Sequence, residues 1–345
     1  MAQAHIVPRM YLKGFADRKR GLAVYNCEVG KPSYCERDVK RVATQQDFYV
    51  LYRSDGKPDP ELEAKFSLLE GRMRAILKRV RGKQELDADQ IDTLCVLASM
   101  QEARSERHRH ALVDPLNRLM DQISEEMRAE GHPQDQIDAH VGLFLRKNLV
   151  SGDIQMDAEN IALLMVPQGV QIRYKFFRCM SKCIVESAAH DFITCDDPVT
   201  WTETFRQAEF GFNYLSVSAE VTYPLTRRHC LVLSYFPLQT RAAGDAEIVT
   251  IVNARTAGNA LREVYAQPKD SKGEQQRFID DILSVDMRRR PLIPRLIADP
   301  AKSAMPDLVR LSRHLGMESG YLTEINQPFL DFMMKGQDGG LVLAT

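Results

Sequence analysis

Hydrophobic and polar positions follow different patterns along the chain, and each pattern predicts a different kind of element. Near the N-terminus, short runs of β-branched, aromatic and other apolar residues predict strands over residues 21–25 and 47–52. Glycine, proline, serine and aspartate predict turns at residues 30–33 and 54–56. A small mixed sheet or a pair of hairpins is therefore expected in this part of the chain.

Helical spacing of apolar residues takes over from residue 60. Pro60 fits the first position of a helix that ends near Gly82, and Asp87 with Gln90 forms a capping box for the next helix. A kink or break is expected near Pro167 and Gly169 in the last helix of this series. The helices are predicted over residues 60–82, 88–113, 115–130, 134–149 and 158–182.

Alternating β-branched segments return in the second half of the chain. A turn at residues 188–191 would join the first two of these strands as a hairpin. A helix over residues 246–266 and shorter helices between the later prolines follow. The strands are predicted over residues 183–186, 192–195, 219–223 and 230–234.

The order of these elements predicts an α+β fold, because strands and helices are segregated along the chain instead of alternating. A small N-terminal β region, a central helical layer, a second β region and C-terminal helices are expected in that order. No linker rich in glycine, serine or proline divides the chain. We therefore expect one interwoven domain over residues 1–266 and a C-terminal helical extension, residues 267–345, packed on it.

Composition narrows the class of protein without identifying its function. The content of 44% hydrophobic and 27% charged residues is typical of a globular protein. The longest apolar run, residues 161–166, is far shorter than the roughly 18 residues of a membrane span, and the N-terminus lacks an apolar signal core. A cytoplasmic protein without a membrane segment is expected, and its seven dispersed cysteines are expected to be reduced thiols.

Charge and sequence motifs exclude several functions. The net charge of −1 gives no global basic field for nucleic acid. Local basic segments at residues 72–83 and 287–295 could meet nucleic acid, although such runs also serve simply to solvate a helix. The phosphate-loop, dinucleotide-binding, nucleophile-elbow and zincin motifs are absent from the sequence.

One candidate site lies on the helix predicted over residues 88–113. Its apolar face turns polar at Gln101, Arg104 and His108, and buried polar groups need internal partners or a ligand. The alternative is a solvated C-terminal half of the helix, where Arg and His are favoured by the helix dipole.

Two further candidates lie at opposite ends of the helical region. Asp196 and Asp197 follow a predicted strand and could bind a divalent metal or act as a general base, although aspartate before proline also opens ordinary turns. His5, Arg9 and Tyr11 lie within the first fifteen residues, where a lone histidine is often a structural, hydrogen-bonded residue.

Together these stretches resemble a bacterial family of unknown function, DUF4238. The opening His-x-Val-Pro-x-x-Tyr-Leu-x-x-Phe is matched by residues 5–15, and the family's Phe-Ile-Thr-Ser-Asp-x-Pro-Val by residues 192–199, with Cys195 in place of the usual serine. Asp-Phe-Tyr at residues 47–49 and the Gln-x-x-Arg of Gln101 and Arg104 also fit. The resemblance covers roughly residues 3–266 and implies that His5, Arg104 and Asp196 belong together, without implying a reaction.

The first functional hypothesis is a metal-dependent hydrolase or nuclease acting on a phosphodiester or nucleotide, in a setting such as phage defence or a toxin system. His5 would be the acid or base and Arg104 would stabilise phosphoryl charge. Asp196 would be a catalytic base or, with Asp197 and Glu70, would hold Mg²⁺ or Mn²⁺. The residues expected to contact substrate are Arg9, Tyr11, Gln101 and His108.

The second hypothesis is a non-catalytic module that binds a partner protein through its surface. The same His, Arg and Asp residues would then form a buried polar network, with an Arg104–Asp196 ion pair at its centre. Gln101 distinguishes the two hypotheses: an open pocket beside it favours an enzyme, whereas a sealed position favours the network.

Overall fold

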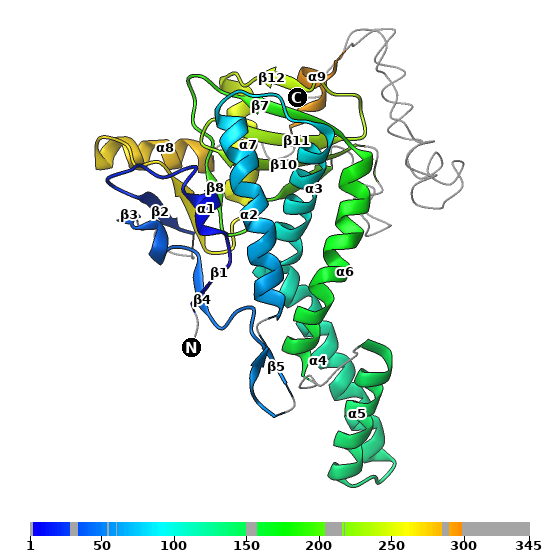
Figure 1. The fold of residues 1–345 in the computed structure, drawn as a ribbon. Coiled ribbons are helices and arrows are strands. Elements are labelled where there is room, and N and C mark those ends of the chain that lie inside the picture. The colour runs from blue at the N-terminus through cyan, green and yellow to red at the C-terminus, as the bar shows by residue number, and fades with distance from the viewer. Residues whose placement is uncertain are drawn as a thin grey trace.

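Long helices and short β-sheets occupy different parts of the chain, which confirms the predicted α+β class (Figure 1). The computed structural model describes residues 3–27, 34–53, 55–59, 61–149, 157–203, 216, 218–284 and 290–298. The turn predicted at residues 30–33 and the basic segment at residues 287–289 lie outside the described residues. A continuous apolar core joins the N-terminal segment, three of the long helices and the larger sheet.

The N-terminal region consists of very short elements wrapped around the start of the helical layer. β1 pairs with β4, β2 pairs with β3, and β5 pairs with β6, all antiparallel. The elements are β1 (Gln3–His5), α1 (Arg9–Leu12), β2 (Leu22–Asn26), β3 (Tyr34–Arg37), the 3₁₀ helix η1 (Val39–Arg41), β4 (Thr44–Gln46), β5 (Leu51–Tyr52) and β6 (Pro58–Asp59).

The strand predicted over residues 47–52 is wrong for most of its length. Asp47 has a φ of 53°, in the left-handed region that ends a strand, and β5 includes only Leu51 and Tyr52. Phe48 and Tyr49 are nevertheless buried, because the turn directs both rings into the core. The apolar run therefore predicts correctly that these residues are buried, but it does not predict their backbone conformation.

Helices α2, α3 and α6 lie side by side, with α3 packed against both α2 and α6, whereas α4 packs on α6 and α5 packs on α4 (Figure 1). The predicted capping box is confirmed, because Gln90 N donates to Asp87 Oδ1 at 2.8 Å and Asp87 N donates to Gln90 Oε1 at 3.2 Å. None of the described helices combines the length and apolar character needed to cross a membrane. The helices are α2 (Glu61–Arg81), α3 (Ala88–Ala103), α4 (Glu106–Ala129), α5 (Gln134–Leu149) and α6 (Ala158–Cys179).

Two predicted helix boundaries are wrong. The helix expected to reach Val113 ends at Ala103, and α4 begins at Glu106 because the Ser105 hydroxyl accepts from His108 N at 3.2 Å as an N-cap. Pro115 consequently lies inside α4 instead of starting a helix. Of the kink or break expected near Pro167, the break is absent, since α6 continues past it to Cys179.

The second half of the chain contributes every strand of the larger sheet and two strands, β8 and β13, of a smaller sheet that also contains β2 and β3. The larger has the order β12-β7-β11-β10-β9 and the smaller the order β3-β2-β13-β8. The predicted 188–191 hairpin is wrong, because β7 pairs with β11 whereas β8 pairs with β13 in the other sheet. The strands are β7 (Ser181–Glu186), β8 (Thr194–Cys195), β9 (Thr200–Glu203), β10 (Ala219–Thr226), β11 (His229–Ser234), β12 (Arg241–Ala243) and β13 (Glu263–Ala266).

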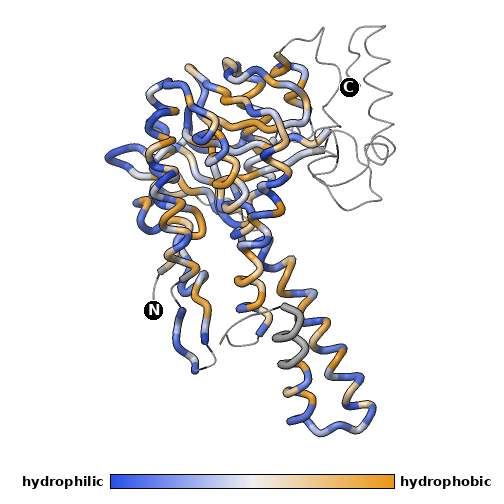
Figure 2. Tube along the Cα trace, turned by 45° about the vertical axis from the view of Figure 1, so that its right-hand side comes forward, coloured by the Kyte–Doolittle hydropathy of each residue, from blue (hydrophilic) through white to orange (hydrophobic). Residues whose placement is uncertain are grey.

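The helix predicted over residues 246–266 is only partly confirmed. Its first part is α7 (Ala246–Asn259), but its last residues form β13, whose pairing with both β2 and β8 outweighs local helical spacing. Two later helices, α8 (Lys272–Ser284) and α9 (Ile293–Leu296), place buried side chains against the rest of the fold. Helices α4 and α5 project away from the sheets, with hydrophobic residues recurring along both tubes (Figure 2).

Candidate functional site

The first candidate, Arg104, occupies a buried centre between α3 and α2. Its guanidinium Nη1 donates to Glu70 Oε1 at 3.1 Å, and only 1% of its side chain is exposed. The group also lies over the rings of Tyr49 and Phe66, 5.5 and 5.4 Å from their centroids. One carboxylate and two aromatic faces thus stabilise a charge that would be costly to bury alone.

Several polar atoms in this centre have no hydrogen-bond partner in the part of the chain that the structure describes. They are Gln101 Oε1, Arg104 Nε, Arg104 Nη2 and His5 Nε2. Gln101 is 1% exposed and its amide donates to Ile6 O at 3.3 Å. A buried polar atom left unpaired costs about 1–3 kcal/mol, so such atoms generally hold ordered water or a ligand.

The space around the centre suits water better than a substrate. A cavity of about 10 Å³ is bordered by Arg104 and by His108, which is room for about one water molecule. Gln101 does not border this cavity and is sealed by its neighbours. By the criterion drawn from the sequence, the sealed position of Gln101 favours a buried polar network.

Asp196 lies elsewhere and is held by main-chain donors. Its carboxylate accepts from the N–H groups of Leu261, Arg262 and Glu263 at 2.9, 2.6 and 3.1 Å. Burial raises its pKa, while these three hydrogen bonds act in the opposite direction. The hypothesised Arg104–Asp196 ion pair is therefore wrong: Arg104 pairs with Glu70, and Asp196 fixes the chain that enters β13.

Asp197 is paired differently from its neighbour. Its Oδ2 accepts from Arg107 Nε at 3.0 Å, and burial raises its pKa to about 7. Glu70, Asp196 and Asp197 thus have three different sets of partners. Among the described residues, no group of three or more His, Cys, Asp or Glu side chains is arranged to hold a metal ion, so the expected Mg²⁺ or Mn²⁺ ligand set is not assembled.

Two residues that were expected to contact substrate, His108 and Tyr11, form hydrogen bonds within the fold. His108 lies on α4, where its Nδ1 accepts from Arg173 Nη2 at 3.0 Å, and burial lowers its pKa to about 4. Tyr11 is fully buried, and its hydroxyl contacts Thr194 Oγ1 at 2.8 Å and donates to Pro224 O at 2.5 Å. Both side chains tie elements together; Tyr11 presents no free surface to a substrate, and the partly exposed His108 ring is held by Arg173.

A groove of about 450 Å³ lies beside the N-terminal segment. It lies between residues 9–21 and residues 38–40, so the excursion of β2 and β3 brings its two sides together. Six cationic side chains border it, against two carboxylates: Arg9, Lys13, Arg18, Lys19, Arg20 and Lys40. We call this feature the basic groove.

The two carboxylates of the basic groove, Asp17 and Asp38, accept hydrogen bonds from main-chain N–H groups. Asp17 Oδ1 accepts from the N–H groups of Lys19 and Arg20 at 2.8 and 2.9 Å, and Asp38 Oδ1 caps η1 by accepting from Lys40 N at 2.7 Å. Arg20 pairs with Glu36. The other five cations of the groove are exposed and form no ion pair with any described residue.

His5 connects the basic groove with the buried centre. Burial lowers the pKa of His5 most, and the charge of Arg9 lowers it next. The charge of Glu70 raises this pKa, and that of Arg104 lowers it. Val39, which borders the groove, forms a main-chain hydrogen bond with the His5 ring. His5 and Arg9 were expected from the sequence, whereas Lys13, Arg18, Lys19 and Lys40 were missed; the run Arg18-Lys19-Arg20 was the available signal.

Comparisons with known proteins give a family and no relative of established activity. The family model described as "Protein of unknown function (DUF4238)" matches residues 3–270. No curated protein and no solved structure matches the chain significantly.

Proposed function

Because the chain belongs to the DUF4238 family, whose description assigns no activity, we propose a function from the geometry alone: the protein binds the phosphate groups of a nucleic acid or nucleotide in the basic groove. The supporting observation is the set of five exposed cations that form no ion pair with any residue the structure describes, around a hollow of about 450 Å³. Like charges at such a site repel each other unless an anion compensates them. Phosphate oxygens accept hydrogen bonds from both arginine and lysine, and arginine binds them through paired N–H donors.

The groove favours recognition of the phosphate backbone over recognition of bases. None of the described residues that line it is aromatic, so it offers no ring on which a base could stack. Lysine and arginine contacts to phosphates position a nucleic acid but carry no sequence information. The expected binding is therefore independent of sequence and weakened by salt.

Direct binding tests this proposal. Labelled RNA and DNA oligonucleotides of mixed sequence are titrated with the full chain and with the variant Lys13→Gln/Arg18→Gln/Lys19→Gln, and affinity is read from fluorescence anisotropy. The matched control, Arg72→Gln/Arg74→Gln/Lys78→Gln, removes the same charge from exposed positions of α2. A loss of at least about tenfold for the groove variant alone supports the proposal. Equal losses in both variants, or a loss in the α2 variant alone, would contradict it.

Phosphodiester hydrolysis is the second candidate function, and His5 is the observation that favours it. The His5 side chain is partly exposed and lies within reach of the charge of Arg9, and its buried Nε2 has no partner among the described residues. Because its pKa is lowered, the ring is neutral at pH 7 and able to accept a proton from an attacking hydroxyl. Arg9 would hold the phosphate and, behind it, Arg104 would act on His5 through its charge.

Cleavage assays test hydrolysis separately from binding. Labelled RNA and DNA are incubated with the protein in EDTA, Mg²⁺ or Mn²⁺, and with His5→Gln and Arg104→Ala. Turnover lost in His5→Gln with oligonucleotide affinity retained supports the candidate; full turnover in that variant rejects it. Unfolding of Arg104→Ala, with no turnover in the parent, supports the non-catalytic network. For the cellular setting we propose a bacterial cytoplasmic protein, in which cleavage would serve defence or toxicity.

A further inference from the structure

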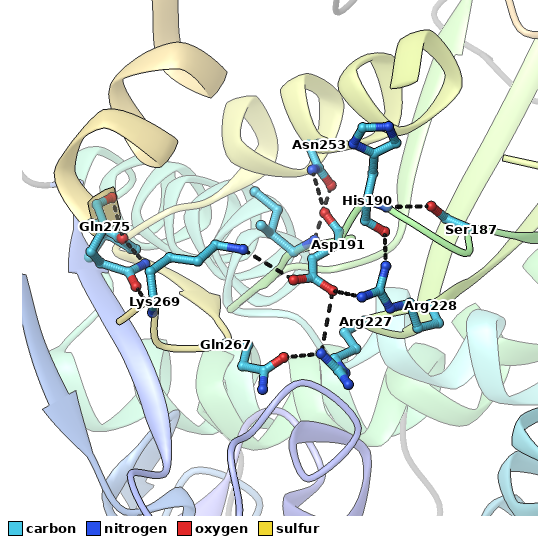
Figure 3. A network of polar contacts seen from close by, with 11 residues as sticks. Ser187, His190, Asp191, Arg227, Arg228, Asn253, Gln267, Lys269 and Gln275 are labelled. Atoms are coloured by element: carbon cyan, nitrogen blue, oxygen red, sulfur yellow. Dashed lines mark hydrogen bonds and ion pairs between the residues drawn. The ribbon is translucent and has the colours of Figure 1, made fainter. Parts of the chain in front are cut away.

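A second cationic cluster surrounds Asp191, after the end of β7 (Figure 3). Asp191 Oδ2 lies 3.1 Å from Lys269 Nζ, and its Oδ1 lies 3.4 Å from Arg228 Nη2 and 3.7 Å from Arg227 Nη1. One carboxylate therefore faces three cations. None of these cations forms an ion pair with another described carboxylate, so positive charge is left uncompensated. We call Arg227, Arg228 and Lys269 the Asp191 cluster.

The remaining contacts of the cluster go to neutral groups. Arg228 Nη1 donates to His190 O at 3.1 Å, and Arg227 Nη1 donates to Gln267 Oε1, as Figure 3 shows. The arginines are held in place by these contacts without losing their charge. Their side chains remain accessible, 40% exposed for Arg227 and 29% for Arg228. Solvent-facing, oriented arginines with an excess of charge are suited to binding an anion.

The Asp191 cluster adjoins the basic groove. Arg227 N donates to Gly14 O at 3.1 Å, and Gly14 directly follows Lys13, which lines the groove. Gln267 makes a second connection. Main-chain hydrogen bonds lower the pKa of the Asp17 carboxyl most, and a hydrogen bond with the Gln267 side chain lowers it further. Because Gln267 also accepts a hydrogen bond from Arg227, its amide lies between Asp17 and Arg227.

We propose that the basic groove and the Asp191 cluster form one continuous track for phosphates, and that the ligand is a nucleic-acid strand several nucleotides long instead of a mononucleotide. This inference rests on the proposed phosphate binding in the groove and specifies the class of its ligand. A single nucleotide would occupy the groove alone. A strand leaving the groove beside Lys13 and Gly14 meets Arg227, where its next phosphates would compensate the excess charge around Asp191.

Dependence of affinity on oligonucleotide length tests the track. A nucleoside triphosphate, a tetranucleotide and a dodecanucleotide of mixed sequence are titrated with the parent chain and with Arg227→Gln/Arg228→Gln. The Arg227→Lys/Arg228→Lys variant keeps the charge, and Arg72→Gln/Arg74→Gln is the matched control. The glutamine variant is expected to bind the dodecanucleotide about five- to tenfold more weakly and the triphosphate within about twofold of the parent. The lysine variant is expected to recover most of the loss.

The outcomes separate this inference from the proposed function. If the groove variant loses binding of every ligand while Arg227→Gln/Arg228→Gln binds the dodecanucleotide like the parent, the track is rejected and groove binding stands. If the parent binds no oligonucleotide, or binds anionic phospholipid vesicles more tightly than any oligonucleotide, both are rejected. Circular dichroism confirms folding, and if the glutamine variant unfolds, the lysine variant with Lys269→Gln, which removes one positive charge from the cluster, is compared with the lysine variant and should bind the dodecanucleotide more weakly.

Discussion

Two aspartates that are neighbours in the sequence, Asp196 and Asp197, have different roles, because the fold gives them different surroundings. Asp196 and Asp197 are adjacent in a motif that made both of them candidate metal ligands or bases. Folding gives Asp196 three main-chain donors and Asp197 a single arginine, Arg107. Burial raises the pKa of both carboxyls; main-chain N–H donors oppose this rise at Asp196, whereas Arg107 opposes it at Asp197, whose pKa is about 7.

The Asp197 carboxyl predicts a pH dependence of stability. Its pKa is about 7 in the fold against an ordinary value of 3.8, so between these values the folded chain binds more protons than the unfolded chain. The free energy of unfolding should therefore fall as pH rises through this window. Asp197→Asn, which cannot ionise, should remove this part of the loss. Tm measured for both chains from pH 4 to pH 8 should show a difference that grows in favour of the variant; a constant difference would contradict the role.

Tyr11 predicts a stability effect without a binding effect. Tyr11→Phe keeps the ring that stacks on Tyr223 but leaves Pro224 O and Thr194 without the hydroxyl. Removal of this buried hydrogen-bond partner should lower the free energy of unfolding by about 1–3 kcal/mol. Urea denaturation measures this change. Oligonucleotide affinity is expected to stay at the parent value, and a large loss of affinity in a folded variant would return Tyr11 to the binding site.

At the scale of elements, local signals in the sequence predicted what depends on local contacts. The capping box of Asp87 and Gln90, the extent of α2 and the start of α6 behind Asp157 were all expected, because each depends on residues within one or two turns. The break between α3 and α4 was missed, although Ser105 is a favourable N-cap. Gln101, Arg104 and His108 continue the helical spacing of the preceding apolar face across this break, and that continuity concealed the boundary.

The 17–21 turn predicts that one small substitution disturbs the basic groove. Gly21 has a φ of +77°, and a Cβ built on it would lie 2.3 Å from Arg37 O. Gly21→Ala should destabilise the fold by more than about 1 kcal/mol, because the new atom strains the backbone and separates the turn from β3. Thermal unfolding measures the loss, and Gly131→Ala is the control, since its Cβ would meet nothing despite a φ of +83°. Equal losses in the two variants would show that φ alone matters.

At the scale of the whole molecule, the sequence predicted the fold class but not the pairing of distant segments. β13 lies between β2 and β8, strands that are far apart in the sequence. The hydrophobic periodicity of the sequence does not indicate that these strands pair with β13. The same limitation affected the site: Arg9 and His5 were recognised, but Lys40 joins them only through the folding of β2 and β3. Charge separated along the chain becomes a surface feature only in three dimensions.

Residues 290–298 are expected to be part of the same cooperative unit as the larger sheet. Glu220 is fully buried and accepts from Leu292 N, Ile293 N and Arg255 Nη2, the last at 2.6 Å. Arg255→Met would leave this carboxylate buried without its cation, which costs about 3–5 kcal/mol. Denaturation should show that loss in a single transition, with faster proteolysis near residues 290–298. An unchanged transition would mean that the segment is docked independently.

The most direct test of phosphate binding in the basic groove is the dependence of oligonucleotide affinity on salt. Log affinity against log salt concentration is measured for the parent and for Lys13→Gln/Arg18→Gln/Lys19→Gln with a single-stranded dodecanucleotide. The parent should give a straight, negative slope, and the variant a slope shallower by about 0.7 for each phosphate that its side chains no longer neutralise. Identical slopes for the two proteins, or an affinity that does not change with salt, would contradict the account.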